Sequence, residues 1–88
     1  LIDHGFCTYE NVAEVLRYEN LIAPTGKLPV NTSGGNLAHG FVHGFVTAVE
    51  SIRCLRGESP NPVPGAKTSL LCGGPSSPTI SSAIFGVD

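Results

Sequence analysis

Residues 28–57, LPVNTSGGNLAHGFVHGFVTAVESIRCLRG, decide how the rest of the chain is interpreted. A short apolar segment leads into a polar loop with the pair Gly34-Gly35, and the loop is followed at once by a strongly patterned helical sequence. Enzymes with α/β folds use this arrangement to bring backbone N–H groups to a substrate at the start of a buried helix. The stretch therefore predicts a short strand over Lys27–Val30, a polar loop, and a helix that begins near Leu37 and ends before Gly57.

The predicted helix separates into three stripes on a helical projection. One stripe contains two glycines, and each glycine inside a helix costs about 0.5–1 kcal/mol relative to alanine. A sequence keeps such glycines where another backbone must approach the helix closely. We therefore expect a helix sandwiched between layers, with Gly57 as its C-terminal stop. The stripes are apolar (Phe41, Phe45, Ala48, Ile52, Leu55), small (Gly40, Gly44, Thr47, Ser51, Cys54) and more polar (His39, His43, Val46, Glu50, Arg53).

The flanking segments carry weaker signals. Asn11, with Glu14 three residues later, can form a capping box on two helical turns, although an irregular excursion or a hairpin fits the same stretch. Pro24-Thr25-Gly26 predicts a turn. The expected organisation is an irregular region (1–26), a strand, loop and central helix (27–57), a Pro-rich connection (58–66) and a C-terminal hairpin (67–88) with strands Lys67–Cys72 and Ile80–Phe85.

The bulk composition narrows the class of protein. The chain has 88 residues, 41% of them apolar and 14% charged, no methionine, and a net charge of −2, so we expect a globular piece of a longer protein. Lysine and arginine total only 5, which argues against a nucleic-acid partner. No apolar run approaches the roughly 18 residues of a membrane span, and no signal peptide is visible. A cytoplasmic location follows as the expectation, with the 3 cysteines as reduced thiols.

Three groups of residues can carry chemistry. Cys72-Gly73-Gly74 places a thiol at the end of a predicted strand beside free backbone N–H groups, which suits an acid/base or a nucleophile near an oxyanion hole, or else it is a buried cysteine before an ordinary turn. His39 and His43 are spaced i, i+4 and can chelate a metal, but no third ligand is evident, so we expect no metal site. His43 alone can serve as a general acid/base.

The loop Asn31-Thr32-Ser33-Gly34-Gly35 is the third group. Its amides, at a helix N-terminus, can line a thioester or phosphate site, or the loop can be a flexible connector with a Ser/Asn cap. It is not a phosphate-binding Walker A loop, because Gly34-Gly35 lacks the following Gly-Lys-Ser/Thr.

These segments together resemble the C-terminal end of thiolase-superfamily proteins, and most closely the sterol-carrier/lipid-transfer-protein branch that includes steroid side-chain aldolases. The resemblance covers nearly the whole chain in the right order. It is carried by Asp3-His4-Gly5-Phe6-Cys7, Leu28 to Gly35, His39 to Gly44, Glu50 to Gly57 and Cys72-Gly73-Gly74.

The resemblance implies an α/β fold, namely a C-terminal fragment of a five-layer αβαβα architecture with one central buried helix plus short strands. It implies an acyl-CoA thioester substrate, with coenzyme A as a substrate moiety and no separate cofactor, and a homodimer of the full-length protein. It also implies a nucleophilic cysteine in an upstream half and an Asn-Glu-Ala-Phe-type segment upstream of Leu1, so the fragment alone is expected to be inactive.

The resemblance assigns roles residue by residue. Cys72 would handle a proton at the substrate α-carbon, and the N–H of Gly74 would support an oxyanion. Phe41 stands where thiolases carry the histidine of Gly-His-Pro, and a phenyl ring neither transfers a proton nor donates a hydrogen bond. Phe41 would then line the acyl pocket beside Asn31 and Gly35 in the substrate-binding loop.

The leading hypothesis is therefore part of an acyl-CoA enzyme that makes or breaks a C–C bond, as an acyltransferase or by retro-aldol cleavage. The alternative is a non-catalytic thiolase-fold subunit that binds acyl-CoA or a partner such as an OB-fold protein. An independent metal-binding module using His39 and His43 is the third hypothesis.

A substitution at position 41 probes the departure from the thiolase pattern. Phe41→His is expected not to create thiolysis of a 3-ketoacyl-CoA by itself, because the proton transfers also depend on other groups. Release of a shortened acyl-CoA in the presence of free CoA is the measurement. Robust thiolysis would show that the missing histidine was the only obstacle.

Overall fold

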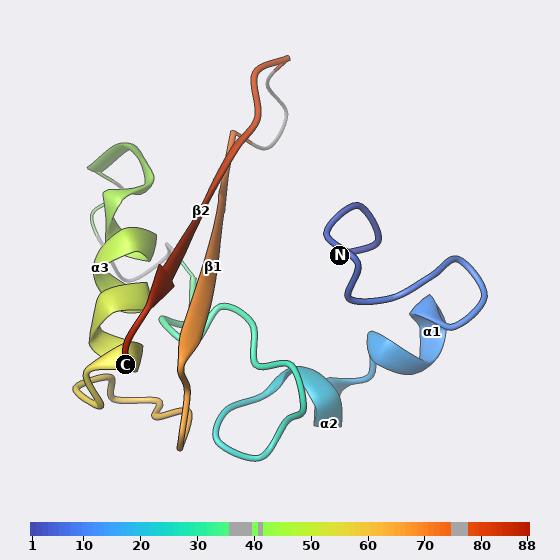
Figure 1. Ribbon diagram of the computed structural model, residues 1–88, viewed down its shortest axis with the longest axis horizontal. Helices are drawn as coiled ribbons and strands as arrows, with labels where there is room; N and C mark the ends of the chain where they lie inside the picture. Colours follow the sequence, from blue (N-terminus) through green and yellow to red (C-terminus); the bar gives the residue numbers. More distant parts are fainter. Residues whose placement is uncertain (36–39, 41, 75–77) are drawn as a thin grey trace.

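The computed structural model describes residues 1–35, 40, 42–74 and 78–88. The fold is α/β, as expected from the sequence, with a helix packed against a two-stranded antiparallel sheet (Figure 1). The short helices α1 and α2 lie apart from this unit, on the other side of the hairpin from the long helix α3 (Figure 1). The described elements are α1 (Val12–Val15), α2 (Tyr18–Leu21), the 3-10 helix η1 (Val42–Gly44), α3 (Phe45–Leu55), β1 (Thr68–Gly73) and β2 (Ser81–Gly86).

The C-terminal hairpin confirms the predicted pair of strands. Both strands lie one residue later than expected, and their register runs from Thr68 opposite Gly86 to Gly73 opposite Ser81. Because side chains alternate along a strand, Cys72 shares a face with Ile84, which is 75% exposed. The thiol therefore lies on the open face of the hairpin, while Phe85 on the other face is half-buried.

Helix α3 begins at Phe45, so the predicted start near Leu37 is wrong for the residues that the structure describes. Val42, His43 and Gly44 have φ angles of 44°, 49° and 82°, all in the left-handed region, which interrupts a right-handed helix. Residues 36–39 and 41, which include His39 and Phe41, lie outside the described residues.

The predicted stop at Gly57 is confirmed. Gly57 has a φ of 71°, its N–H donates to the carbonyl of Cys54, and the N–H of Glu58 donates to the carbonyl of Arg53. These two bonds form a Schellman motif, in which a left-handed glycine satisfies the last carbonyls of the helix.

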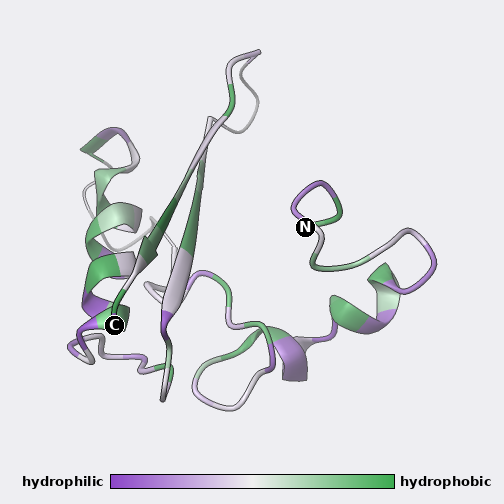
Figure 2. Ribbon diagram, viewed as in Figure 1, coloured by the Kyte–Doolittle hydropathy of each residue, from purple (hydrophilic) through white to green (hydrophobic). Residues whose placement is uncertain are grey.

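The expected burial of α3 is not reached within the described residues. Ser51 is its one buried residue, whereas Phe45 is 65% and Ile52 is 42% exposed. The small stripe is thus the more covered one, and Phe45 and Ile52 of the apolar stripe stay exposed although the hairpin packs against the helix. Figure 2 shows the apolar residues along α3 and both strands.

The N-terminal region differs from the sequence prediction in its capping. Helix α1 is a single turn, and the capping box is wrong, because the Asn11 side chain makes no hydrogen bond to the N–H groups of the helix. Asn11 Oδ1 instead accepts a hydrogen bond from the backbone N–H of Thr8 at 2.8 Å. The side chain therefore closes the preceding turn, a common alternative for asparagine.

The predicted strand over Lys27–Val30 does not form. The N–H groups of Leu28 and Val30 donate instead to the carbonyls of Asn20 and Leu21 at the end of α2. Pro29, between them, has no N–H to donate to a ladder. The segment thus folds back on α2 through the predicted turn, which is closed by the N–H of Gly26 and the carbonyl of Ile22 at 2.7 Å.

Gly26 is a position where a side chain has no room. A Cβ there would collide with the backbone carbonyl oxygens of Asn20 and Ile22. We predict that Gly26→Ala lowers the free energy of unfolding by about 1–3 kcal/mol, the usual cost of overpacking. Thermal or urea unfolding of the natural protein measures it. Gly40→Ala is the matched control, because among the described residues the Cβ there would meet a Val42 methyl at 3.9 Å and no closer atom. Equal losses in the two variants would contradict the prediction.

Candidate active site

The first and last parts of the chain meet at Cys72. The Sγ atom of Cys72 lies 3.7 Å from Nε2 of His4, although 68 residues separate them in the sequence. His4 is held by a tight N-terminal turn, in which the N–H of Gly5 donates to Ile2 and the N–H of Phe6 donates to Leu1. Both side chains are exposed, so the pair is open to a ligand.

A thiol and an imidazole at this distance can exchange a proton. Either atom can act as the donor, depending on the tautomer of His4. Histidine titrates near neutral pH, which makes it the usual general acid/base in enzymes. The pair His4 and Cys72 is thus a candidate acid/base site.

The glycines after Cys72 keep the neighbouring backbone free of side chains. Gly74 has a φ of 82°, a conformation that favours glycine. A Cβ at Gly74 would also collide with the carbonyl oxygen of Thr79. The two residues that follow Cys72 therefore leave the main chain without side chains, which an oxyanion-binding role can use.

The loop Asn31–Gly35 forms a sharp turn next to α3. Asn31, Gly34 and Gly35 have φ angles of 51°, 81° and 85°, and the N–H of Gly34 donates to the carbonyl of Asn31 at 2.9 Å. Asparagine is among the residues that best tolerate the left-handed region. Among the described residues, no heavy atom lies within 4 Å of a Cβ built on Gly34 or Gly35.

The carboxylate of Glu50 ties this loop to α3 and to the Pro-rich connection. Its Oε1 atom accepts hydrogen bonds from Thr32 Oγ1 at 2.7 Å, Ser59 Oγ at 2.6 Å and Cys54 Sγ at 3.3 Å. The amide of Asn61 adds a bond to the carbonyl of Thr32 at 2.6 Å. We call Thr32, Glu50, Cys54, Ser59 and Asn61 the Glu50 network.

The pKa of Glu50 reflects two opposing effects. Partial burial of the carboxylate raises its pKa, while the hydrogen bonds from Ser59, Thr32 and Cys54 and the positive charge of Arg53 lower it. The lowering effects dominate, so the pKa of Glu50 lies below its ordinary value and the side chain is ionised at neutral pH.

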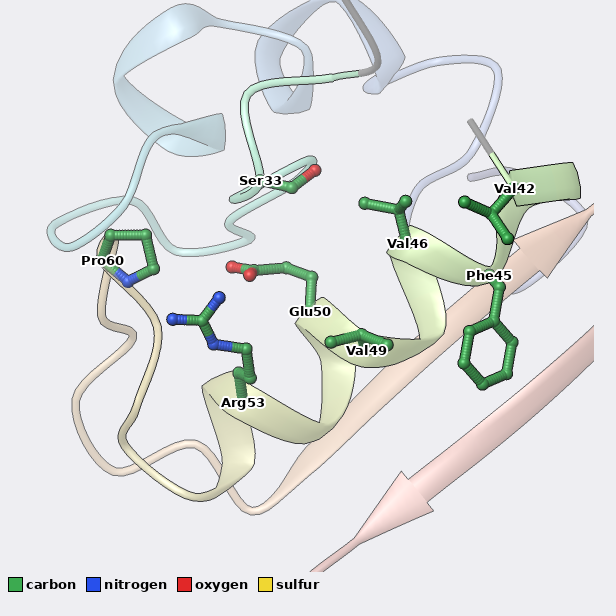
Figure 3. A pocket seen from close by; sticks show the side chains of 8 residues that line it. All are labelled: Ser33, Val42, Phe45, Val46, Val49, Glu50, Arg53 and Pro60. Atoms are coloured by element: carbon green, nitrogen blue, oxygen red, sulfur yellow. The ribbon is translucent and has the colours of Figure 1, made fainter. Parts of the chain in front are cut away.

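A groove of about 310 Å³ runs along α3 beside the Glu50 network (Figure 3). Apolar side chains line it toward the start of the helix, and charged ones toward the end. Ser33 and Pro60 reach it from the two neighbouring loops (Figure 3). The lining residues are Ser33, Val42, Phe45, Val46, Val49, Glu50, Arg53 and Pro60.

The structure distributes the predicted site residues over three places. Cys72 and Gly74 stand at the end of β1, Asn31 and Gly35 stand in the loop beside the Glu50 network, and His43 is an exposed residue of η1. Phe41 lies outside the described residues.

Sequence reasoning missed His4 as a partner of Cys72. Its one signal was its place in the Asp3–Cys7 block that carries the resemblance.

Among the described residues, no three His, Cys, Asp or Glu side chains gather in a way that could hold a metal ion. In the same part of the chain, every helix is too short or too polar to cross a bilayer.

Comparison with known proteins identifies the family. Residues 1–85 match the family described as Thiolase C-terminal domain-like. The chain belongs to this family, as the resemblance implied.

Two curated relatives are similar to the chain. One is the 17-hydroxy-3-oxo-4-pregnene-20-carboxyl-CoA lyase of Mycobacterium tuberculosis, 38% identical over 82 residues that cover 93% of this chain and 21% of that enzyme. The other is the steroid side-chain-cleaving aldolase of Thermomonospora curvata, 34% identical over 84 residues that cover 96% of this chain and 21% of that enzyme. The chain thus spans about a fifth of the length of these relatives. No solved structure matches it significantly.

The lowered pKa of Glu50 predicts a pH dependence of stability. Its stabilising effect is complete above the unfolded-state pKa of glutamate, about 4.3, and is lost as the pH falls through the lower folded-state pKa. Glu50→Gln should therefore lower the free energy of unfolding by about 1 kcal/mol at pH 7 and by less below pH 4. Urea unfolding of the natural protein at both pH values measures this. A difference that grows on acidification would contradict the prediction.

Proposed function

We propose that this chain supplies part of the active site of a thiolase-like lyase that breaks a C–C bond in a β-hydroxyacyl-CoA thioester by retro-aldol cleavage. The observation that carries the proposal is the contact of His4 Nε2 with Cys72 Sγ at 3.7 Å on an exposed face beside Gly74. The names of both relatives, a CoA lyase and a side-chain-cleaving aldolase, support this class of reaction.

The reaction needs one proton removed and one delivered. A base takes the proton of the β-hydroxyl group, the Cα–Cβ bond breaks, and the hydroxyl carbon becomes a carbonyl. The electron pair of the broken bond moves into the thioester as an enolate. An acid then protonates the α-carbon, which gives a ketone or aldehyde and a shortened acyl-CoA with no net change in protons.

The pair at the end of β1 has the groups that this sequence requires. In the proposal, His4 accepts the hydroxyl proton and Cys72 delivers a proton to the α-carbon. The hydroxyl oxygen and the α-carbon are two bonds apart in the substrate, so groups 3.7 Å apart can serve both. The pair resets when His4 passes its proton to the Cys72 sulfur. The N–H of Gly74 would stabilise the enolate oxygen.

Phe41 favours cleavage without thiolysis. Retro-aldol cleavage needs no activated cysteine nucleophile, whereas thiolysis in the thiolases depends on the histidine that Phe41 replaces in the resemblance. We propose that Phe41 lines the acyl pocket, that Asn31 and Gly35 contact the thioester, and that His43 is a second candidate acid/base. Coenzyme A enters as part of the substrate.

The finer assignments follow from the relatives. A steroid CoA thioester is the first substrate to test, because the names of both relatives refer to steroids or their side chains. A homodimer, an OB-fold partner protein and a cytoplasmic location remain proposals that rest on the resemblance and the sequence.

Substitution of the pair tests the proposal. In the natural protein, purified with any partner it requires, Cys72→Ala and His4→Asn should each lower kcat/KM for cleavage of a β-hydroxyacyl-CoA by about 10²–10⁴-fold, the usual contribution of an acid/base group. Release of shortened acyl-CoA, followed by chromatography, is the measurement.

Ser82→Ala is the matched control, because Ser82 is directly opposite Cys72 on β2 and exposed. Its activity should stay within twofold of wild type. Full cleavage activity in Cys72→Ala would exclude the proposed role and favour a non-catalytic thiolase-fold subunit.

A further inference from the structure

We propose that Glu50 is a positioning residue, which holds the Asn31–Gly35 loop against α3 in the shape that receives the CoA thioester. The identity of the ligand rests on the proposed function. The role of Glu50 in shaping the loop rests on the contacts of the Glu50 network and is tested separately below.

The network joins three segments at a single oxygen atom. Thr32 comes from the loop, Cys54 from the next turn of α3, and Ser59 from the connection that follows the helix, and all three donate to Oε1 of Glu50. Ser59 is 8% exposed, so this side of the carboxylate is shielded from water. Hydrogen bonds to an ionised carboxylate are about twice as strong as those between neutral groups. The Glu50 carboxylate therefore holds the loop, the helix and the connection in place relative to one another.

The loop is held on both sides of Thr32. Its hydroxyl donates to Glu50 and its carbonyl accepts from Asn61 Nδ2 at 2.6 Å. The Asn61 backbone is in turn held by Ser59, whose hydroxyl oxygen accepts from the Asn61 N–H at 3.1 Å. Asn31 adjoins this fixed residue and has a φ of 51°, a left-handed conformation that asparagine tolerates and that the bonds of Thr32 help to hold.

The position of Glu50 connects the loop to the groove. Ser33, the next residue of the loop, lines the groove together with Glu50 and Arg53 (Figure 3). Loss of the carboxylate would release the loop from the helix at the point where both form one surface. We therefore expect Glu50 to affect substrate binding through the loop, without taking part in proton transfer at the Cys72 pair.

Kinetics of the natural protein separate positioning from catalysis. Glu50→Ala and Thr32→Val should each raise KM for the CoA thioester at least fivefold and change kcat less than twofold. Glu50→Gln keeps an acceptor oxygen and should restore KM to within twofold of wild type. Glu58→Ala is the matched control, because Glu58 is an exposed carboxylate whose side chain pairs with Arg56 at 2.9 Å.

Hydrogen exchange tests the shape of the loop without any substrate. The N–H of Gly34 donates within the turn, so its exchange reports whether the turn is closed. Glu50→Ala should speed exchange of residues 31–35 at least tenfold and leave residues 68–73 of β1 unchanged. Glu50→Gln keeps an acceptor oxygen and should speed this exchange by no more than about fivefold.

The outcomes distinguish the two proposals. Faster exchange confined to residues 31–35 supports the positioning role even if wild type cleaves no CoA thioester, a result that would overturn only the proposed function. Unchanged exchange in Glu50→Ala, or faster exchange along the whole chain, would overturn the positioning role. A fall in kcat with KM unchanged in an active enzyme would overturn it as well.

Discussion

The three hydrogen bonds accepted by one oxygen of Glu50 are the interaction on which the arrangement of the helix, the loop and the Pro-rich connection depends. Within the described residues, Cys7 is the one buried hydrophobic side chain, so these segments share no fully buried apolar core. A carboxylate can do so because it is ionised at neutral pH and accepts several donors at once. The apolar side chains of Phe45, Val46 and Val49 are then left free to line a groove along α3.

Parts of the fold with local signals could be predicted. The hairpin was predicted to within one residue, because its strands are bounded by glycine and proline, and the helix end was predicted from Gly57. The start of α3 was not predicted correctly. The repeat His-Gly-Phe-Val at 39–46 has helical periodicity, yet Val42 and His43 are left-handed, which periodicity does not encode. The strand over Lys27–Val30 failed because its N–H groups find acceptors at the end of α2.

In the candidate site, too, residues with a local sequence signal could be predicted and residues joined by long-range contacts could not. Cys72 and Gly74 could be found from the sequence, since a thiol before two glycines has a chemical meaning by itself. Its partner His4 could not, because it lies 68 positions away in the sequence and a contact at that separation leaves no periodic trace. The Glu50 network was missed for the same reason: Thr32 and Ser59 lie 18 and 9 residues from Glu50, and side-chain hydrogen bonds of this kind depend on the path of two loops.

The central claim is that His4 and Cys72 act as one unit. A double-mutant cycle on kcat/KM tests it most directly, with His4→Asn, Cys72→Ala and the double variant made in the natural protein. If the two groups work as one unit, removing either one already abolishes their combined contribution. The kcat/KM of the double variant should therefore be no more than threefold below that of the slower single variant. Losses that multiply in the double variant would show two independent contributions and would contradict the account.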